Sequence, residues 1–333
     1  MRCLALAAAL IGAAVAAGDA GAGDAATGAA DADARAHPTG RIDRIPVRRP
    51  AMVWVPAGHF LIGLSPRESE RLLQACSVEL GLAARACDGS TGYPLPPLLQ
   101  GTHGIGVREV FVGAFRIDRH EVTSAEFRAC VAAGACDVAA LVSGEPAYLQ
   151  STWPMVNVGW QDAVDYCAWR GKRLPTEAEW ERAARGDDGR RWPWGDQDRR
   201  DGANTGQSES DVVKLARAEQ GIVLWLTAPD DRDGGLYALP PGTLHWGEGP
   251  YGTLDQAGNV AEWVTDYFSA DGYRGLSRIN PVRELPPGAE KRRVVRGGDW
   301  YSPRHLARTY VRRGQGPETR LPWVGFRCAA EAR

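Results

Sequence analysis

The central segment VNVGWQDAVDYCAWRGKRLPTEAEWERAARG, residues 156–186, constrains the fold most, because it encodes two helices whose ends are marked by their own residues. The first helix is predicted from four residues that fall on one face at helical spacing, Ala163, Val164, Cys167 and Ala168. Gly171 then supplies the C-terminal stop, since glycine readily adopts the left-handed conformation that ends many helices.

The second helix of this segment begins after Thr176 and stops at Gly186. Glu179 follows Thr176 by the spacing of a capping box, in which each side chain accepts the backbone N–H of the other residue. Pro175 precedes the cap and prevents the two helices from merging. The segment therefore predicts two short, separate helices.

The residues before this segment predict strands and shorter helices. Residues 51–63 alternate apolar and small residues and read as a strand or hairpin, and residues 110–118 are strand-like. Residues 65–82 have apolar residues at helical spacing. Thr123 and Glu126 form a second capping box, which predicts another short helix.

The remaining chain shows few long periodic segments, and its composition explains why. The 333 residues include 12 Trp, 40 Gly and 22 Pro, which favours a loop-rich fold held together by indole packing over a regular bundle or sandwich. The formal net charge is −2 and no basic block stands out, so nucleic acid is not an expected partner.

The N-terminus predicts export. In residues 1–18 an arginine precedes an apolar run and small residues follow, which is the pattern of a secretory signal peptide, the alternative being an Ala-rich disordered start. The run is too short to span a bilayer comfortably, so no membrane span is expected. Residues 19–48 are rich in Ala, Gly and Asp and predict a flexible tether. One domain is expected over residues 49–333, in the periplasm or outside the cell.

Six cysteines remain after the predicted leader, and an even number in an exported protein suggests disulfides. Cys76 with Cys87, and Cys130 with Cys136, are natural local pairs, which leaves Cys167 and Cys328 to pair across the chain. Spacing alone does not fix this connectivity, and buried free thiols are the alternative.

Five motifs occur in the order seen in the formylglycine-generating enzyme family, also called the sulfatase-modifying factor family. They are GKRLPTEAEWERAARG, PWGD, GTLDQAGNVAEW, RVVRGGDW and GFRC. The chain resembles that family over roughly residues 50–330. The resemblance implies an α+β, loop-rich single domain, distantly similar to C-type lectins, in which Cys167 and Cys328 match structural cysteines of the family.

The resemblance also implies calcium, held by oxygen atoms of two loop regions. The first predicted set is the Asn204 side chain, the Thr205 carbonyl, Asp233 and the Gly235 carbonyl. The second predicted set is Asp255, the carbonyls of Gly258 and Val260, and Glu262. Several oxygens, with carboxylates mixed among carbonyls, are the ligands that a hard cation prefers. An ordinary Asp/Asn/Gly turn is the alternative interpretation of the second set.

The family's oxidases carry two copper(I)-binding cysteines after the glycine pair, and in this chain those positions are Ser302 and Ala307. Copper(I) is soft and selects thiolates, whereas serine offers a hard oxygen and alanine offers no ligand. Asp299 replaces the family's serine, and Pro303 stands where histidine is usual. Copper is therefore not expected, and copper-dependent oxidation of a sulfatase cysteine is not the expected activity.

The same segment could instead bind a ligand, because it offers flat aromatic faces and guanidinium groups. The candidate groove residues are Asp299, Trp300, Tyr301, Ser302, Arg304, His305 and Arg308. Arg312 and Arg313 follow them as further donors. The alternative interpretation is that Trp300 is a core residue and the arginines form a solvated face.

Two functions follow from these observations. The first is a pseudoenzyme: a calcium-stabilised module that binds a peptide, a protein or a surface glycan. The second is a noncanonical oxidoreductase or maturation enzyme of the same superfamily, acting in sulfatase or siderophore maturation, since the resemblance includes periplasmic relatives that lack the oxidase cysteines.

Overall fold

The structure is a computed structural model. It describes residues 51–65, 68, 70–71, 106–142, 146–197, 199–206, 235–269, 271–285, 287–288, 291–302 and 304–332. Contacts group Arg49–Arg333 into one compact unit. The predicted leader and tether, and nearly all of the predicted helix over residues 65–82, lie outside the described residues.

The two central helices are confirmed as α5 (Trp160–Trp169) and α6 (Glu177–Arg185). The α6 capping box is complete, since the Thr176 hydroxyl accepts from the Glu179 N–H and the Glu179 carboxylate accepts from the Thr176 N–H. Gly171 and Gly186 follow the two helices with φ angles of 67° and 68°, which are positive values that glycine adopts without strain.

The other helices are short. The predicted cap at Thr123 is confirmed at α3 (Ser124–Ala132), where Glu126 completes the capping box. The remaining α-helix is α4 (Ala139–Val142), and the 3-10 turns are η2 (Pro146–Tyr148), η3 (Arg200–Gly202), η4 (His245–Gly247) and η5 (Arg304–Ala307). Among the described residues no helix is long and apolar enough to cross a membrane.

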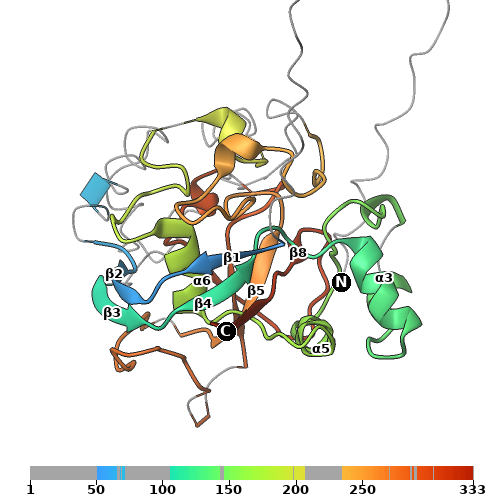
Figure 1. Ribbon diagram of the computed structural model, residues 1–333, viewed down its shortest axis with the longest axis horizontal. Coiled ribbons are helices and arrows are strands. Elements are labelled where there is room, and N and C mark those ends of the chain that lie inside the picture. The colour runs from blue at the N-terminus through green and yellow to red at the C-terminus, as the bar shows by residue number, and fades with distance from the viewer. Residues whose placement is uncertain are drawn as a thin grey trace, which may run out of the picture. The chain divides into compact units, whose positions relative to one another are not determined.

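The strands form three small sheets (Figure 1). The first has the order β1-β4-β9, with β1 (Met52–Val55), β4 (Phe115–Asp118) and β9 (Ala329–Glu331). The second pairs β2 (Gly58–Ile62) with β3 (Arg108–Val112). The strands expected within residues 51–63 and 110–118 are thus confirmed, as two strands in each region.

The third sheet positions the candidate site. Its order is β7-β6-β5-β8, with β5 (Ala261–Tyr267), β6 (Arg293–Arg296), β7 (Arg312–Gln315) and β8 (Val324–Gly325). Strand β6 runs antiparallel to both β5 and β7, whereas β8 runs parallel to β5. Strand β7 therefore stands at one edge of this sheet.

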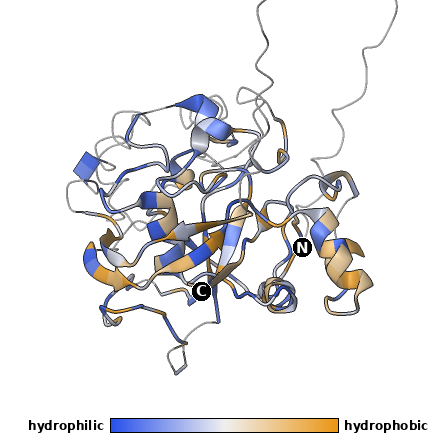
Figure 2. Cartoon of the chain, in the orientation of Figure 1, coloured by the Kyte–Doolittle hydropathy of each residue, from blue (hydrophilic) through white to orange (hydrophobic). Residues whose placement is uncertain are grey.

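Apolar residues form most of the core, and the less buried faces of β1 to β4 carry both apolar and polar residues, such as Trp54 and His59. Strand β1 alternates buried and less buried positions, and Figure 2 shows mixed hydrophobic and hydrophilic colouring along β1 to β4. In the largest cluster the rings of Phe127, Tyr166 and Phe326 contact one another. This cluster joins α3 and α5 to the C-terminal segment.

Helix α6 is unusual because all nine of its residues are buried although five of them are charged. Glu177 and Glu181 accept hydrogen bonds from Arg296 at 2.7 Å each, and Arg312 donates two bonds of 2.7 Å to Glu177. Buried charges are tolerated when they are paired in this way. The network ties α6 to strands β6 and β7.

Two predicted disulfides are confirmed. Cys130 of α3 is bonded to Cys136, which follows the helix, and their Cα atoms lie 5.4 Å apart. Cys167 of α5 is bonded to Cys328, which lies 161 residues further along the chain. Cys76 and Cys87 lie outside the described residues.

Candidate functional site

The segment between β6 and β7 begins with a glycine pair that allows a close approach of the backbone. Gly297 and Gly298 have φ angles of 94° and 69°, in the region that favours glycine. A Cβ atom on Gly298 would lie 2.8 Å from the backbone nitrogen of Ala307. The glycine pair therefore allows the start of this segment to lie directly against η5.

Asp299 organises the segment from a fully buried position. Its Oδ1 atom accepts from the N–H groups of Tyr301 at 3.1 Å and Ser302 at 2.7 Å. Its Oδ2 atom accepts from Nη2 of Arg313 at 2.6 Å, and Nη1 of Arg313 lies 3.3 Å from Oγ of Ser302. The carboxylate is thus held by Arg313 and by two backbone amides.

Trp300 is a core residue, with 3% of its surface exposed. Its ring contacts four other aromatic rings, those of Tyr148, Tyr237, Tyr301 and Trp323. Its indole N–H donates to the carbonyl of Pro322. The structure therefore favours the interpretation that Trp300 is a core residue and does not line a groove.

The remaining candidate groove residues pack in different places, some near Trp323 and others near Trp192. Ser302 and His305 are buried, and Tyr301 is half-buried and stacks on Trp323 at 5.2 Å. The half-buried Arg304 and Arg308 place their guanidinium groups over the ring of Trp192, at 5.1 and 5.8 Å. The seven residues adjacent in sequence thus do not line one open groove.

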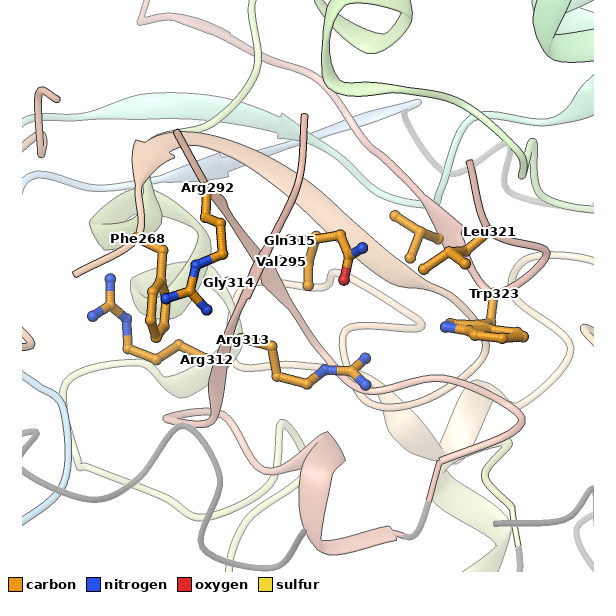
Figure 3. Close-up of a pocket in the computed structure, with 10 residues that line it drawn as sticks. Phe268, Arg292, Val295, Arg312, Arg313, Gly314, Gln315, Leu321 and Trp323 are labelled. Atoms are coloured by element: carbon orange, nitrogen blue, oxygen red, sulfur yellow. The ribbon is translucent and has the colours of Figure 1, made fainter. Parts of the chain in front are cut away.

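A pocket of about 500 Å³ lies beside β7 (Figure 3). Four consecutive residues of β7 line it, namely Arg312, Arg313, Gly314 and Gln315. Phe268 and Arg292 line one end, and Leu321 and Trp323 line the other. Because Arg313 also contacts Asp299 and Ser302, the pocket adjoins the predicted segment.

Sequence reasoning named Arg312 and Arg313 but missed the other pocket residues. Phe268 follows β5, Arg292 precedes β6, and Trp323 precedes β8, so three separate chain segments meet here. The order of the motifs along the chain does not predict that these three segments lie together. The two arginines were found because they follow the segment directly in the sequence.

Buried carboxylates behind the pocket have altered acidity. Burial would raise the pKa of Glu177, but the guanidinium groups of Arg312 and Arg296 hold it below its ordinary value. Burial and the nearby Glu177 raise the pKa of Asp266 to about 7. Asp266 accepts from the N–H groups of Glu177 and Arg283, so it joins the start of α6 to the loop after β5.

The structure describes only part of the first predicted calcium set, and one atom of that part, Oδ1 of Asn204, is compatible with a cation. Asn204 is buried, and its Nδ2 atom donates to the Tyr237 carbonyl and to Oδ1 of Asn259. The Oδ1 atom of Asn204 is buried and has no hydrogen-bond donor among the described residues. An amide oxygen in that situation suits a hard cation. Thr205 and Gly235 are described, whereas Asp233 lies outside the described residues.

The second predicted set fits a cation poorly at its carboxylates. Both Glu262 oxygens accept from Arg327, at 2.6 and 2.7 Å, and one also accepts from the Trp180 indole. Asp255 accepts from the Gly242 N–H at 2.6 Å and lies 3.7 Å from Nδ1 of His120. The charge of Glu262 is thus already balanced by a guanidinium. Among the described residues, no group of three or more His, Cys, Asp or Glu side chains is arranged to hold a metal ion.

Comparisons with known proteins agree with the motif order. Residues 39–332 match the sulfatase-modifying factor enzyme 1-like domain. Inactive C-alpha-formylglycine-generating enzyme 2 of Mus musculus is 34% identical over 54% of this chain and 49% of its own length. The formylglycine-generating enzyme of Streptomyces coelicolor is 34% identical over 63% of this chain and 69% of its own length.

The chain spans about half the length of the first of these curated relatives. Among solved structures, PvdO from Pseudomonas aeruginosa superposes with a TM-score of 0.59 and 25% sequence identity. That match covers 84% of this chain and 94% of PvdO.

Proposed function

The chain belongs to the sulfatase-modifying factor family, and we propose that it binds a ligand without carrying out the copper-dependent oxidation that the resemblance implies for the family's oxidases. The occupant of the site would be a peptide or another surface ligand. The pocket beside β7 supports this proposal, because it adjoins the segment in which those oxidases carry their cysteines.

The observation that carries the proposal is the surroundings of the two substituted positions. The Ser302 hydroxyl lies against the Arg313 guanidinium, and the fully buried Ala307 packs in an apolar cluster with Trp192. Every cysteine that the structure describes is bonded in a disulfide. A soft cation such as copper(I) prefers thiolates, and a neighbouring guanidinium would repel it.

Calcium at the Asn204 loop is part of the proposal. The Oδ1 atom of Asn204, which has no donor in the part of the chain that the structure describes, supports it, since a cation there would satisfy a buried oxygen. The ion would supply cohesion between loops that have little regular structure. The sequence pattern at the N-terminus and the two disulfides support export into an oxidising compartment.

Metal analysis of protein purified without chelator, together with mass spectrometry of a cysteine peptide after incubation, tests the proposal. The expected result is calcium without copper or iron, and a peptide of unchanged mass. Conversion of the peptide thiol to an aldehyde would overturn the proposal, as would stoichiometric copper.

A second candidate is a noncanonical oxidoreductase or maturation enzyme of the same superfamily. The likeness to PvdO favours it, because that likeness covers 84% of this chain and 94% of PvdO at 25% identity. This candidate predicts a bound redox metal, iron or copper, in the purified protein. The same metal analysis therefore separates the two functions.

A further inference from the structure

We infer that the pocket beside β7 recognises an extended peptide segment that carries a carboxylate next to a large apolar side chain. This inference rests on the proposed binding function and names the class of ligand. Four observations carry it: the charge of the pocket, the fixed orientation of Arg313, the apolar end of the pocket, and the position of β7 in its sheet.

The charged residues that line the pocket, among those that the structure describes, are all cationic. The ten described residues that line it include Arg292, Arg312 and Arg313 and no aspartate or glutamate. Arg312 is bound through two of its nitrogens to Glu177 on the side of α6, so part of its charge is balanced from behind. A carboxylate entering the pocket would still meet guanidinium groups and no lining acid, which favours an anionic ligand.

Arg313 is the residue best placed to bind a carboxylate. Its side chain is 26% exposed, whereas its partner Asp299 is fully buried. Asp299 is itself fixed by the Tyr301 and Ser302 amides, so it holds the guanidinium in one orientation. A guanidinium has five N–H donors, and a single carboxylate does not satisfy all of them. Such preorganisation lowers the entropy cost of binding, which makes Asp299 a positioning residue.

The end of the pocket away from Phe268 and Arg292 is apolar. Leu321, Trp323 and Val324 line it, and Tyr301 stacks on the Trp323 ring and holds it in place. In Figure 3 Arg313 extends from β7 towards Trp323. A ligand that offers a carboxylate to Arg313 would therefore bring its neighbouring side chain against an aromatic wall.

The position of β7 favours a peptide over other carboxylates. Strand β7 stands at the edge of the sheet, with β6 as its strand partner among the described residues. Gly314 lines the pocket in the middle of the strand, where the Phe268 ring packs against it in the space that a side chain would fill. Extended peptides commonly add to such edges through main-chain hydrogen bonds, with alternate side chains entering pockets.

Fluorescence anisotropy with the full chain and its disulfides intact tests the inference. The probe is a labelled pentapeptide of alternating leucine and glutamate, compared with counterparts that carry glutamine or lysine in place of glutamate. The glutamate peptide should bind about tenfold more tightly than the glutamine peptide, because a charge-assisted bond replaces a neutral one. The lysine peptide should bind more weakly than either.

Two variants of one residue provide the sharpest readout. Gln315 lines the pocket from the half-exposed end of β7 and can change charge with little change of shape. Gln315→Glu should weaken binding of the glutamate peptide and Gln315→Lys should strengthen it, each by about threefold. Binding of the glutamine peptide should change little. Damage to folding would move both variants in the same direction.

Arg313→Gln should abolish the preference for the glutamate peptide over the glutamine peptide. The matched control is Arg274→Gln, which changes an exposed arginine outside the pocket lining and should leave that preference in place. Equal binding of the glutamate and glutamine peptides, tighter binding of the lysine peptide, or no binding of any peptide overturns the inference. Tight binding of a neutral or basic peptide leaves the proposed binding function standing, whereas oxidation of a cysteine peptide defeats that function separately.

Discussion

The Nη1 atom of Arg296 lies 2.7 Å from Oε1 of Glu177, and both side chains are almost completely buried. The same guanidinium contacts Glu181 at 2.7 Å through its other nitrogen. This pair joins strand β6 to helix α6, and through Arg312 it extends to the strand that lines the pocket. The position of the pocket therefore depends on buried ion pairs.

Arg296→Met should lower the free energy of unfolding by about 3–5 kcal/mol, because it leaves two buried glutamates short of their cation. Urea denaturation measures the change. The control is Asp201→Asn, which removes an exposed ion pair with Arg199 and should leave the midpoint unchanged. Equal effects of the two variants would show that the buried pair is not what holds β6 on α6.

Removing the long-range disulfide should cost more stability than removing the local one. The Cys167–Cys328 bond closes a separation of 161 residues, whereas the Cys130–Cys136 bond closes one of 6. The loop-entropy relation gives about 5 kcal/mol for the first and about 2 kcal/mol for the second. Unfolding of the two double Cys→Ser variants compares them. A larger loss from the local pair would contradict the expectation.

Stability should fall as the pH rises from about 4 towards 7, in part because of Asp266. Its folded pKa is raised to about 7 by burial and by Glu177, whereas its unfolded pKa is near its ordinary value of 3.8. Between those values the folded state binds the proton and the unfolded state does not, so raising the pH favours unfolding.

Asp266→Asn should reduce that slope, and unfolding at a series of pH values measures it. The buried Asp118 and Glu262 also have raised pKa values, mainly because of burial, so part of the slope should remain. Glu177, whose pKa is lowered, acts in the opposite direction, and its contribution is lost as the pH falls. An unchanged slope in the variant would show that Asp266 does not titrate in this window.

Calcium should raise the melting temperature of the protein, and a chelator should lower it, if the Asn204 loop holds the ion. Asn204→Ala removes the Oδ1 atom, for which the described residues supply no donor, and should abolish the response to calcium. Asn204→Asp, which adds a charge at the same place, should retain or enlarge it. Magnesium is the control ion. A calcium response that survives in Asn204→Ala would place the ion elsewhere.

Much of the fold follows from local signals in the sequence. The capping pairs Thr123–Glu126 and Thr176–Glu179 fix the starts of α3 and α6, because each box satisfies backbone amides within one helical turn. The alternation in residues 51–63 identifies β1 and β2 for a similar reason, since strand periodicity is also local. Five motifs in order then identify the family.

The candidate site was only partly predictable. The sequence drew attention to Asp299 and the residues after it, and it identified the absence of cysteine at Ser302 and Ala307. It did not indicate that Trp300 is enclosed by four aromatic rings, or that Asp299 is bound to Arg313. Adjacent residues in an irregular segment carry no periodicity, so their directions cannot be read from spacing.

The sequence by itself determined the family and the capped starts of α3 and α6, and it placed Ser302 and Ala307 in the segment after the glycine pair, because these depend on residue identity and on neighbours within a few positions. Only the tertiary structure decided that Phe268, Gln315 and Trp323 share a pocket, and that Glu262 is paired with Arg327. Those relationships join residues far apart in the chain, and they arise from burial, which requires each interior charge to find a partner wherever the fold supplies one.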